Sequence, residues 1–484
     1  MAAAFDTLKD AYIDGRWTPA RDGARFTVRN PANGSVLAQV ADCGASETEA
    51  AISAASAAQK DWAARPAGER SAILRRWHDL MVEQADALAE LLTAENGKPL
   101  AEARGEVLYG ASYLEWFSEE AKRLYGDIIP SASVGNRILV IKQPVGVCAA
   151  ITPWNFPNAM LMRKAAAALA AGCTMVAKPA EDTPLSAFAA AKLAGEAGVP
   201  AGVFNVVSSS RAAEVGRVMT GDERVRKISF TGSTGVGKKL LEQSASTVKR
   251  ASMELGGNAP FLVFADADLD AAVEGAVASK FRNAGQTCVC ANRMLIERSI
   301  LPEFAERLTA RVKALKVAPG TEEGAQIGPL INASALDKVE RLVAQARSDG
   351  ASVLTGGARH FAGDLFFAPT VLEDVTADMA VAREEIFGPV APLIAFDREE
   401  QAIRLANDTP YGLAAYVYTR DLGRAFRVGE GLEYGMVGLN EAILSSAAAP
   451  FGGIKQSGYG REGSHMGLDD YVNIKYMLMG GLRA

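Results

Sequence analysis

Histidine and cysteine are both scarce in this chain of 484 residues, which contains three histidines and five cysteines. The histidines (His78, His360 and His465) are scattered and show no ligand spacing with cysteine, so we expect no metal site. The odd number of cysteines and their low density exclude a disulfide scaffold and are typical of a reduced, cytoplasmic protein.

The chain also lacks a basic excess and long apolar runs. Its 51 Lys and Arg against 57 Asp and Glu leave a net charge of −6, which argues against binding to nucleic acid or to an anionic membrane. No uninterrupted apolar run reaches about 18 residues, so we expect no membrane-spanning helix. The first ten residues contain Asp6 and Asp10 and no apolar core, so we expect no secretory signal.

What remains is the composition of an ordinary globular protein, with 49% hydrophobic and 22% charged residues. The length suggests two to four domains at about 100–200 residues each. The pattern near the start of the chain predicts helices over 46–62, 67–96 and 100–125. A segment of strand character, 137–143, follows them, and the segment after Asp469 alternates like another strand that needs a partner.

From residue 145 short apolar runs alternate regularly with helical segments. The runs are 145–151, 173–179, 203–207 and 225–230, and the helical segments lie near 157–171, 183–197, 211–220 and 234–245. This alternation predicts an α/β fold with a parallel sheet covered by helices on both faces. A second alternating region from 260 to about 440 predicts a second α/β unit, with a site in the cleft between the two units.

One motif, FTGSTGVGKK at 230–239, resembles an anion-binding turn between a strand and a helix. It nearly matches a phosphate-binding P-loop, which leaves a nucleotide hydrolase as an alternative, but Lys239 stands where a hydroxyl should bind magnesium. It also lacks the GxGxxG pattern of dinucleotide-binding folds. Its backbone N–H groups at a helix N-terminus would suit an anion, and a plain tight turn is the alternative.

Two charged residues lie at the end of the run 173–179 and just after it. Lys178 at a strand end can contact a ribose or phosphate, and Glu181 can accept hydrogen bonds from both hydroxyls of an adenosine ribose. A carboxylate there would repel a 2′-phosphate. The alternative is a solvated loop with Asp182 at the start of the next helix.

Cys288 is the candidate nucleophile, because it lies in a small, polar segment, GQTCVC at 285–290. A reactive thiol needs access and a polar setting, whereas most isolated cysteines are inert core residues. Cys290, two residues on, is expected to pack in the core, and a redox pair with Cys288 is the weaker alternative.

Two further residues have the chemistry to assist a nucleophile. Glu254 ends a short strand before two glycines, where an apolar setting would make it a general base, although an ordinary ion pair is the alternative. Asn155 lies in a turn stiffened by two prolines, where its amide could stabilise an oxyanion, although an amide bonded to its own turn is the alternative.

Seven motifs occur together in one order along the chain, namely PWNFP, KPAE, FTGST, MELGG, GQTC, EEIFGP (384–389) and PFGG (450–453). With them the sequence closely resembles the NAD(P)-dependent aldehyde dehydrogenase superfamily over almost its whole length. Segments 281–293, 407–422, 450–463 and 469–477 are most similar to the succinate-semialdehyde dehydrogenase branch.

The resemblance implies a mechanism. Cys288 would attack the aldehyde to form a thiohemiacetal, and Asn155 with the Cys288 backbone N–H would hold the oxyanion. Hydride transfer to the nicotinamide would leave a thioester, and Glu254 would activate the water that hydrolyses it. The implied cofactor residues are Thr152, Trp154, Lys178, Glu181, Gly232, Ser233, Leu255, Glu385 and Phe387, with NAD favoured and NADP possible.

In the semialdehyde branch two arginines and a serine bind the distal carboxylate of the substrate. The matching positions are taken as Arg163, Arg293 and Ser445, although either arginine could instead belong to a structural ion pair. Succinate semialdehyde is the favoured substrate, with glutarate semialdehyde and sulfolactaldehyde open. The sequence departs from the branch at residues 440–442, where Glu441 would place a carboxylate near the anion pocket, and in the plain loop 445–449.

The resemblance also implies a Rossmann-like cofactor domain (1–123 and 145–253), a catalytic domain (254–469) and a small bridging β element (124–144 and 470–484). The bridging element implies a homodimer or homotetramer. A catalytically idle structural homologue is a further alternative, against which the presence of Cys288, Glu254 and Asn155 argues.

Overall fold

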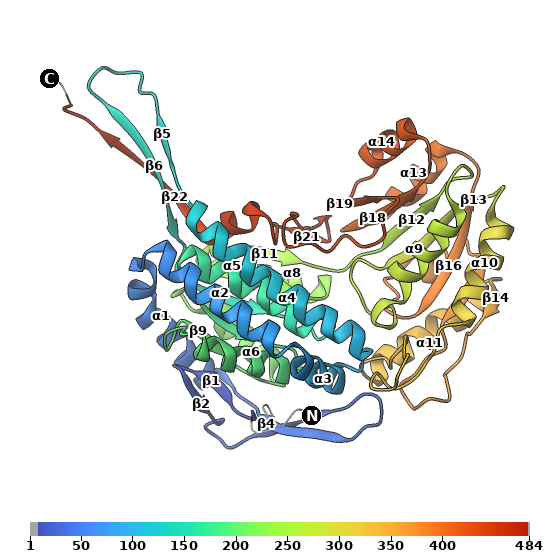
Figure 1. The fold of residues 1–484 in the computed structure, drawn as a ribbon, viewed down its shortest axis with the longest axis horizontal. Helices are drawn as coiled ribbons and strands as arrows, with labels where there is room; N and C mark the ends of the chain where they lie inside the picture. Colours follow the sequence, from blue (N-terminus) through green and yellow to red (C-terminus); the bar gives the residue numbers. More distant parts are fainter. Residues whose placement is uncertain (1–7, 483–484) are drawn as a thin grey trace.

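The structure is a computed structural model, and it describes residues 8–482 of the chain. Its helices and strands form two α/β units and a projecting β arm (Figure 1). Residues 1–7 lie outside the described residues. They include most of the segment for which we expect no secretory signal. No helix within 8–482 is long and apolar enough to cross a bilayer.

The first unit is built on an eight-stranded sheet in the order β2-β1-β9-β8-β7-β10-β11-β21. Its five central strands are parallel, as the alternation with helices predicts, and strand β21 joins antiparallel from far along the chain. The strands are β1 (Ala11–Ile13), β2 (Arg16–Thr18), β7 (Val147–Ile151), β8 (Thr174–Lys178), β9 (Phe204–Val206), β10 (Val225–Thr231), β11 (Arg250–Glu254) and β21 (Gly458–Tyr459).

Eight helices accompany this sheet, and the most deeply placed is α5, in which every residue is buried. Helix α5 begins with Pro157, whose fixed φ suits a first turn, and ends at Gly172 in the left-handed conformation (φ 90°). The helices are α1 (Ala45–Ala64), α2 (Ala67–Glu83), α3 (Ala85–Asn96), α4 (Leu100–Glu120), α5 (Pro157–Ala171), α6 (Leu185–Glu196), α7 (Ala212–Gly221) and α8 (Thr234–Ser244).

The prediction of one long helix over 67–96 is wrong, because the chain breaks at Gln84 into α2 and α3. Gln84 has φ −104° and ψ 18°, outside the helical range, and serves both as the end of α2 and as the start of α3. Each helix buries its own apolar face, Leu74, Trp77 and Met81 in α2, and Leu88 and Leu92 among others in α3. Packing therefore sets this boundary, and no Gly or Pro marks it.

The second unit holds a seven-stranded sheet in the order β14-β15-β16-β13-β12-β18-β19, parallel except for its edge strand β14. The strands are β12 (Ala259–Val263), β13 (Ala291–Glu297), β14 (Ser352–Thr355), β15 (Thr370–Glu373), β16 (Val390–Phe396), β18 (Ala414–Tyr418) and β19 (Met436–Leu439). Its helices are α9 (Leu269–Phe281), α10 (Leu301–Lys313), α11 (Ala333–Ser348), α12 (Ala380–Arg383), α13 (Glu399–Asn407) and α14 (Leu422–Gly431).

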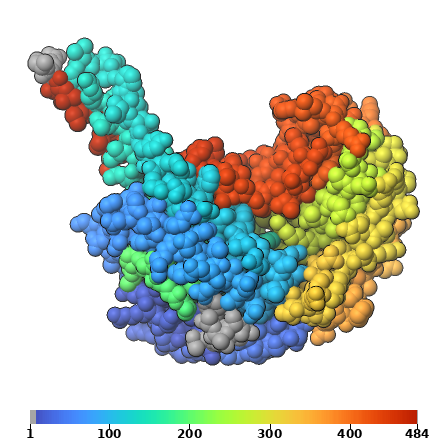
Figure 2. Space-filling model, viewed as in Figure 1, coloured from blue at the N-terminus to red at the C-terminus, as the bar shows by residue number. Residues whose placement is uncertain are grey.

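The two isolated strand segments of the sequence belong to one antiparallel sheet, which projects from the rest of the molecule (Figure 2). Strand β22 (Val472–Met479) pairs along its whole length with β6 (Arg137–Pro144), and β6 pairs with β5 (Asp127–Ile129). Two small antiparallel ladders complete the fold, β3 (Arg25–Arg29) with β4 (Val36–Ala41), and β17 (Tyr411–Gly412) with β20 (Ile454–Lys455).

Candidate active site

Cys288 lies where two cavities meet, because its side chain lines both of them. It follows a short 3₁₀ turn (Arg282–Gly285) in which Asn283, Ala284 and Gly285 all have positive φ (51°, 53° and 75°). The left-handed conformation is energetically unfavourable for residues other than glycine, such as Asn283 and Ala284. Backbone strain of this kind is found most often at functional sites. The turn directs the chain so that the half-buried thiol faces the cavities.

The thiol of Cys288 is protonated at neutral pH. Burial raises its pKa to about 12, the carboxylates Glu385 and Glu254 act in the same direction, and the Arg163 guanidinium opposes them. A nucleophilic role therefore requires a base that removes the thiol proton during the reaction.

Glu254 is a carboxylate of the first cavity that has the properties of a base. It ends β11, and its carboxylate is buried with no hydrogen bond to either oxygen from any residue within 8–482. Burial, with the negative charge of Glu462 as the next contribution, raises the pKa of Glu254 to about 8. Since an unpartnered carboxylate of this pKa is a competent proton acceptor near neutral pH, Glu254 is suited to general-base catalysis.

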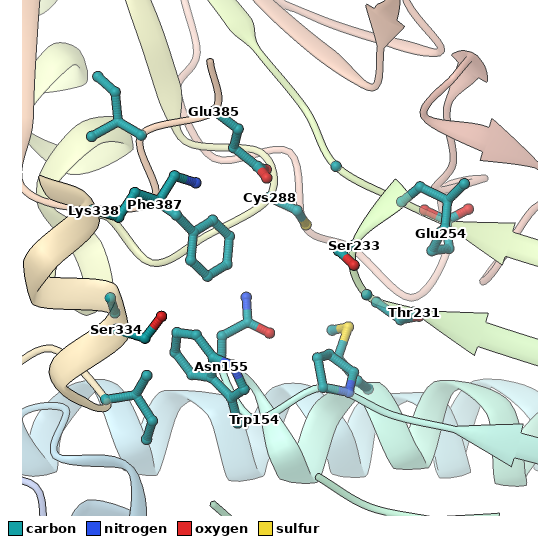
Figure 3. Close-up of a pocket in the computed structure, with 18 of the residues that line it drawn as sticks. Trp154, Asn155, Thr231, Ser233, Glu254, Cys288, Ser334, Lys338, Glu385 and Phe387 are labelled. Atoms are coloured by element: carbon teal, nitrogen blue, oxygen red, sulfur yellow. The ribbon is translucent and has the colours of Figure 1, made fainter. Parts of the chain in front are cut away.

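Asn155 supplies an amide donor to the same cavity as Cys288 and Glu254 (Figure 3). It lies in the turn between β7 and α5, and its Nδ2 donates to the Gln286 carbonyl at 3.0 Å. That bond uses one amide hydrogen, and within 8–482 no protein group accepts the second. The backbone N–H of Cys288 likewise lacks a protein acceptor in the described part of the chain. Two free donors beside a thiol form the arrangement of an oxyanion hole.

A buried charged cluster lies beneath these groups. Arg163 Nε donates to Glu462 Oε2 at 2.6 Å, and Lys164 Nζ donates to the other oxygen of the same carboxylate. Although burial acts in the opposite direction, the two cations lower the pKa of Glu462 to about 2. The Arg163 guanidinium also lies 4.0 Å from the centroid of the Phe451 ring. Its charge is therefore largely balanced inside the protein.

The first cavity, of about 440 Å³, is large enough to hold part of a dinucleotide, and six of the predicted cofactor residues line it. Phe387, at a positive φ of 56°, contacts the Trp154 ring edge to face at a centroid distance of 5.5 Å (Figure 3). Glu385 Oε1 accepts a hydrogen bond from the Gly257 N–H at 2.9 Å, and burial raises the pKa of Glu385. The six are Trp154, Gly232, Ser233, Leu255, Glu385 and Phe387.

The predicted Thr152, Lys178 and Glu181 do not line this cavity. Lys178 ends β8 beside β7, with its Nζ 3.4 Å from the Glu181 carboxylate. Lys178 and Glu181 lie at the carboxyl edge of the sheet, where the adenosine part of a bound dinucleotide would extend from the cavity. The start of α11 also forms part of the cavity wall, through its N-cap Asn332 and through Ser334 and Lys338, and these residues were not predicted from the sequence. No motif marks these residues, since they reach the cavity only through packing of the second unit.

The N-terminus of α8 fits the pyrophosphate of such a cofactor. Ser233 caps the helix through its side chain, and the N–H groups of Thr234 and Gly235 lack a protein acceptor within 8–482. Free N–H groups and the positive end of the helix dipole attract an anion. Ser233 also lines the cavity, which places the anion site on its wall.

The second cavity, of about 270 Å³, lies on the other side of Cys288 and contains two arginines and Ser445. Arg282 is half-buried and lies 5.3 Å from the centroid of the Phe156 ring. Among residues 8–482 nothing makes a hydrogen bond or ion pair with its guanidinium. Unlike Arg163, it is therefore available to bind an anionic group of a ligand.

Arg293, the second arginine predicted to bind substrate, lies elsewhere. Its guanidinium donates to the carbonyls of Asn258, Leu405 and Ala406 and to the Tyr434 hydroxyl. It is buried and does not line either cavity around Cys288. The structure contradicts the prediction for Arg293, because β13 directs this side chain into a backbone network between elements of the second unit.

Glu441 also differs from expectation. Its carboxylate is exposed and accepts hydrogen bonds from the N–H groups of Ala442 and Ile443, at 2.8 and 2.9 Å. It does not line the cavity, whereas Ile443 and Ser445 do. The departure at 440–442 therefore shapes the loop and adds no carboxylate to the anion pocket.

Residues 17–477 match the aldehyde dehydrogenase family. This chain belongs to that family. It is 58% identical to the NADP⁺-dependent succinate-semialdehyde dehydrogenase of Escherichia coli K12, over 98% of each chain. It is 56% identical to the 3-sulfolactaldehyde dehydrogenase of Pseudomonas putida, over 98% of this chain and 97% of the relative. A solved succinate-semialdehyde dehydrogenase from Burkholderia pseudomallei has a TM-score of 0.97 and 58% identity, over 98% of each chain.

Membership of this family gives the seven motifs one explanation, and the predicted fold class is confirmed by the likeness to solved members. The alternative of a nucleotide hydrolase loses its basis. The turn at 230–239 leads into helix α8, and Lys239 still offers no hydroxyl for magnesium.

Proposed function

We propose that this protein oxidises an anionic semialdehyde, with succinate semialdehyde favoured, to the corresponding carboxylate with NAD(P) as the electron acceptor. The observation that carries the proposal is the position of Cys288 between two cavities. The first cavity is suited to part of a dinucleotide. The second is lined by the guanidinium of Arg282, which has no hydrogen-bond or ion-pair partner among residues 8–482. Cys288, Glu254 and Asn155 in a single cavity also argue against a catalytically idle homologue.

The chemistry begins with attack of the Cys288 sulfur on the aldehyde carbon. Glu254 removes the thiol proton, and the oxygen that gains the charge is stabilised by Asn155 Nδ2 and the Cys288 N–H, at about 3–4 kcal/mol per donor in comparable sites. The nicotinamide, when bound, supplies the hydride acceptor that converts the adduct to a thioester. Glu254 passes the thiol proton to solvent and then takes a proton from the water that hydrolyses this thioester, and the departing sulfur regains a proton to restore the thiol.

The substrate class follows from charge. Arg282 offers a planar, unpaired cation, and Ser445 adds a hydroxyl to the same cavity. Hydrogen bonds of a guanidinium to a carboxylate stabilise the complex by about 1.5–3 kcal/mol. A sulfonate or a carboxylate on a longer chain would use the same donors, so glutarate semialdehyde and sulfolactaldehyde are the alternatives to succinate semialdehyde.

For the cofactor we propose NAD as the preferred form. The Glu181 carboxylate lies at the carboxyl edge of β8, half exposed beside Lys178. There it would accept hydrogen bonds from the ribose hydroxyls and repel a 2′-phosphate. Lys178 weakens that repulsion, so NADP is expected to serve as a poorer acceptor.

The proposal also assigns a role to each domain and includes assembly of the chain into an oligomer. Cofactor binding falls to residues 1–123 and 145–253, catalysis to 254–469, and assembly to 124–144 with 470–484. Strand β21 departs from this division because it pairs with β11 in the first sheet. The β arm exposes apolar side chains such as Ile128, Ile474 and Tyr476, which supports a homodimer or homotetramer. The five free thiols support a cytoplasmic location.

The test is a steady-state screen of NAD and NADP with succinate semialdehyde, glutarate semialdehyde, sulfolactaldehyde and neutral aldehydes of similar length. We expect the highest kcat/KM with NAD and succinate semialdehyde. In Arg282→Met the KM for the anionic substrates should rise by roughly 10–100-fold, because about 1.5–3 kcal/mol of binding is lost. The KM for a neutral aldehyde should stay unchanged.

The matched control is Arg298→Met, which removes an exposed arginine that is paired with Asp397 and lines neither cavity around Cys288. It should leave all constants unchanged. A preference of the wild-type protein for neutral aldehydes would refute the proposed substrate class, and the absence of turnover with every aldehyde would refute the activity.

A further inference from the structure

Residues 96–106, which join the end of α3 to the first turns of α4, lie against both loops that provide oxyanion donors. Lys98 in this segment is fully buried, with its Nζ 2.5 Å from Glu106 Oε2. A buried ion pair is costly to desolvate and adds little stability by itself, so its position needs an explanation beyond the fold.

The Lys98 ammonium is directed at the turn that carries Asn155. Its Nζ donates to the Asn155 carbonyl at 2.7 Å and lies 3.9 Å from the centroid of the Phe156 ring. Asn96 Nδ2 donates to the carbonyl of Trp154 at 2.9 Å, so two successive carbonyls of this turn are held from the same segment.

Glu106 holds the other end of the same turn. Its Oε2 faces Lys98, and its Oε1 accepts from the N–H groups of Asn158 and Ala159, at 2.9 and 3.2 Å. These N–H groups belong to the first turn of α5, where a negative charge is favoured. Lys98 and Glu106 together therefore fix the backbone on both sides of Asn155.

A third contact joins the segment to the nucleophile loop. Glu102 Oε2 accepts from the Asn283 N–H at 2.8 Å, in the strained turn before Cys288. Asn283 Nδ2 in turn donates to the Asn155 carbonyl, at 2.9 Å, and to the Gln286 carbonyl, at 3.2 Å. The Asn155 carbonyl is thus shared by Lys98 and Asn283, which ties the two donor-bearing loops together.

We propose that Lys98, balanced by Glu106, is a positioning residue that holds Asn155 so that its amide stays directed at the oxyanion. Lys98 acts through the backbone of Asn155. This inference rests on the proposed function, since it assigns a role within that reaction. It concerns the rate of the chemical step and not the affinity for aldehyde.

The first test is Lys98→Met, which keeps the length of the side chain and removes its charge and its hydrogen bond. We expect kcat to fall on the order of 10²-fold with little change in KM, because a small misplacement of a catalytic group has an effect of this size. The control is Arg104→Met, which removes an exposed ion pair with Asp86 on the same helix and should leave kcat unchanged.

A double-mutant cycle with Asn155→Ala separates positioning from general damage to the fold. If Lys98 acts through Asn155, adding Lys98→Met to Asn155→Ala should lower kcat by no more than about twofold. A loss of the same size in both backgrounds would overturn the inference.

Glu106→Gln provides a second variant should Lys98→Met fail to fold. Gln keeps the shape and can still accept from the Asn158 N–H, but it leaves Lys98 without its counter-charge. Since burial lowers the pKa of Lys98 and Glu106 opposes that shift, the variant should lose kcat at a lower pH than the wild type as pH rises. That loss should vanish in the Asn155→Ala background, and its persistence there would also overturn the inference.

Failure of the wild type to oxidise any aldehyde would refute the proposed function instead.

Discussion

At the scale of single residues, the site depends on one carboxylate that is left without partners. Glu254 lines the cavity with both oxygens free of protein hydrogen bonds within 8–482, and its raised pKa comes from burial and from Glu462. The pKa of the nearby Glu462 is lowered instead, because the charges of Arg163 and Lys164 stabilise its ionised form. Two carboxylates in one region thus acquire different protonation behaviour from their surroundings, which is the usual basis for assigning a base.

The pH dependence of thioester hydrolysis should follow Glu254. Only the ionised carboxylate accepts a proton, and its pKa is raised to about 8. The rate of the hydrolytic step should therefore rise about tenfold per pH unit below pH 8 and level off above it. Steady-state kcat between pH 6 and 9.5 measures this, under conditions where hydrolysis limits turnover. A profile that is flat across pH 7–9 would contradict the assignment.

Replacement of the same residue should separate the two halves of the reaction. In Glu254→Gln we expect kcat to fall by about 10²–10⁴-fold, since a general base contributes this much. Both steps that use the base slow down, and the other carboxylate that lines the cavity, Glu385, already accepts a hydrogen bond from the Gly257 N–H. Stopped-flow absorbance of the reduced cofactor, compared with steady-state turnover, reports which half is slower. Unchanged kcat in this variant would remove Glu254 from the mechanism.

The residues of the site differ in how well the sequence predicts their positions. Cys288, Glu254 and Asn155 were predicted from motifs with distinct local chemistry, and the structure brings all three to one cavity. The prediction of Arg293 as a substrate-binding residue is wrong, and Arg282 was not among the predicted residues, because whether a guanidinium faces a cavity or backbone carbonyls depends on the direction of the local backbone. Strand β13 directs Arg293 toward backbone carbonyls of the second unit, whereas Arg282 immediately precedes the left-handed turn at 283–285 and lines the second cavity.

At the scale of elements, the site is built where strand ends meet helix starts. Strand β11 ends at Glu254, β7 leads into the Asn155 turn, and α8 begins beside the cavity at Ser233. The alternation of short apolar runs with helices predicted these junctions, because its period differs clearly between strand and helix. The break at Gln84 and the contribution of α11 could not be predicted, since they arise from packing between distant segments.

Helix α8 should be sensitive to side-chain size at Gly237. A Cβ there would lie 2.5 Å from Leu255 Cδ2, on the wall of the cofactor cavity. Gly237→Val should displace the helix N-terminus and weaken NAD binding by about tenfold, at a typical overpacking cost of 1–3 kcal/mol. Titration of tryptophan fluorescence or calorimetry gives the Kd. Gly221→Ala, where a Cβ meets nothing within 4 Å, is the control, and equal Kd values in both variants would contradict this account of α8.

At the scale of the whole molecule, the β arm lies apart from both α/β units (Figure 1). Ile474 is 70% exposed and Tyr476 is 60% exposed, in a strand that pairs with β6 over its whole length. Exposed apolar side chains on a well-formed sheet mark an interaction surface. The sequence predicted both strands but not their exposure, which depends on where the arm leaves the body.

Charged substitutions on the arm should therefore dissociate the oligomer. In the double variant Ile474→Lys/Tyr476→Lys each subunit loses about 1.5–3 kcal/mol of burial per side chain. We expect a shift to a smaller species in light scattering coupled to size-exclusion chromatography. Phe361→Lys, which alters a single exposed aromatic residue outside the arm (95% exposed), should leave the mass unchanged. An unaltered mass in the double variant would contradict assembly through the arm.

The most direct test of the whole account is mass spectrometry of Glu254→Gln after reaction with NAD and succinate semialdehyde. Slow hydrolysis should leave the succinyl group attached, and peptide mapping should locate it on Cys288 and not on Cys290. The adduct should be absent when NAD is omitted and in Cys288→Ala. An acyl group found on another residue, or turnover of substrate with no adduct at Cys288 on any timescale of quenching, would contradict the account.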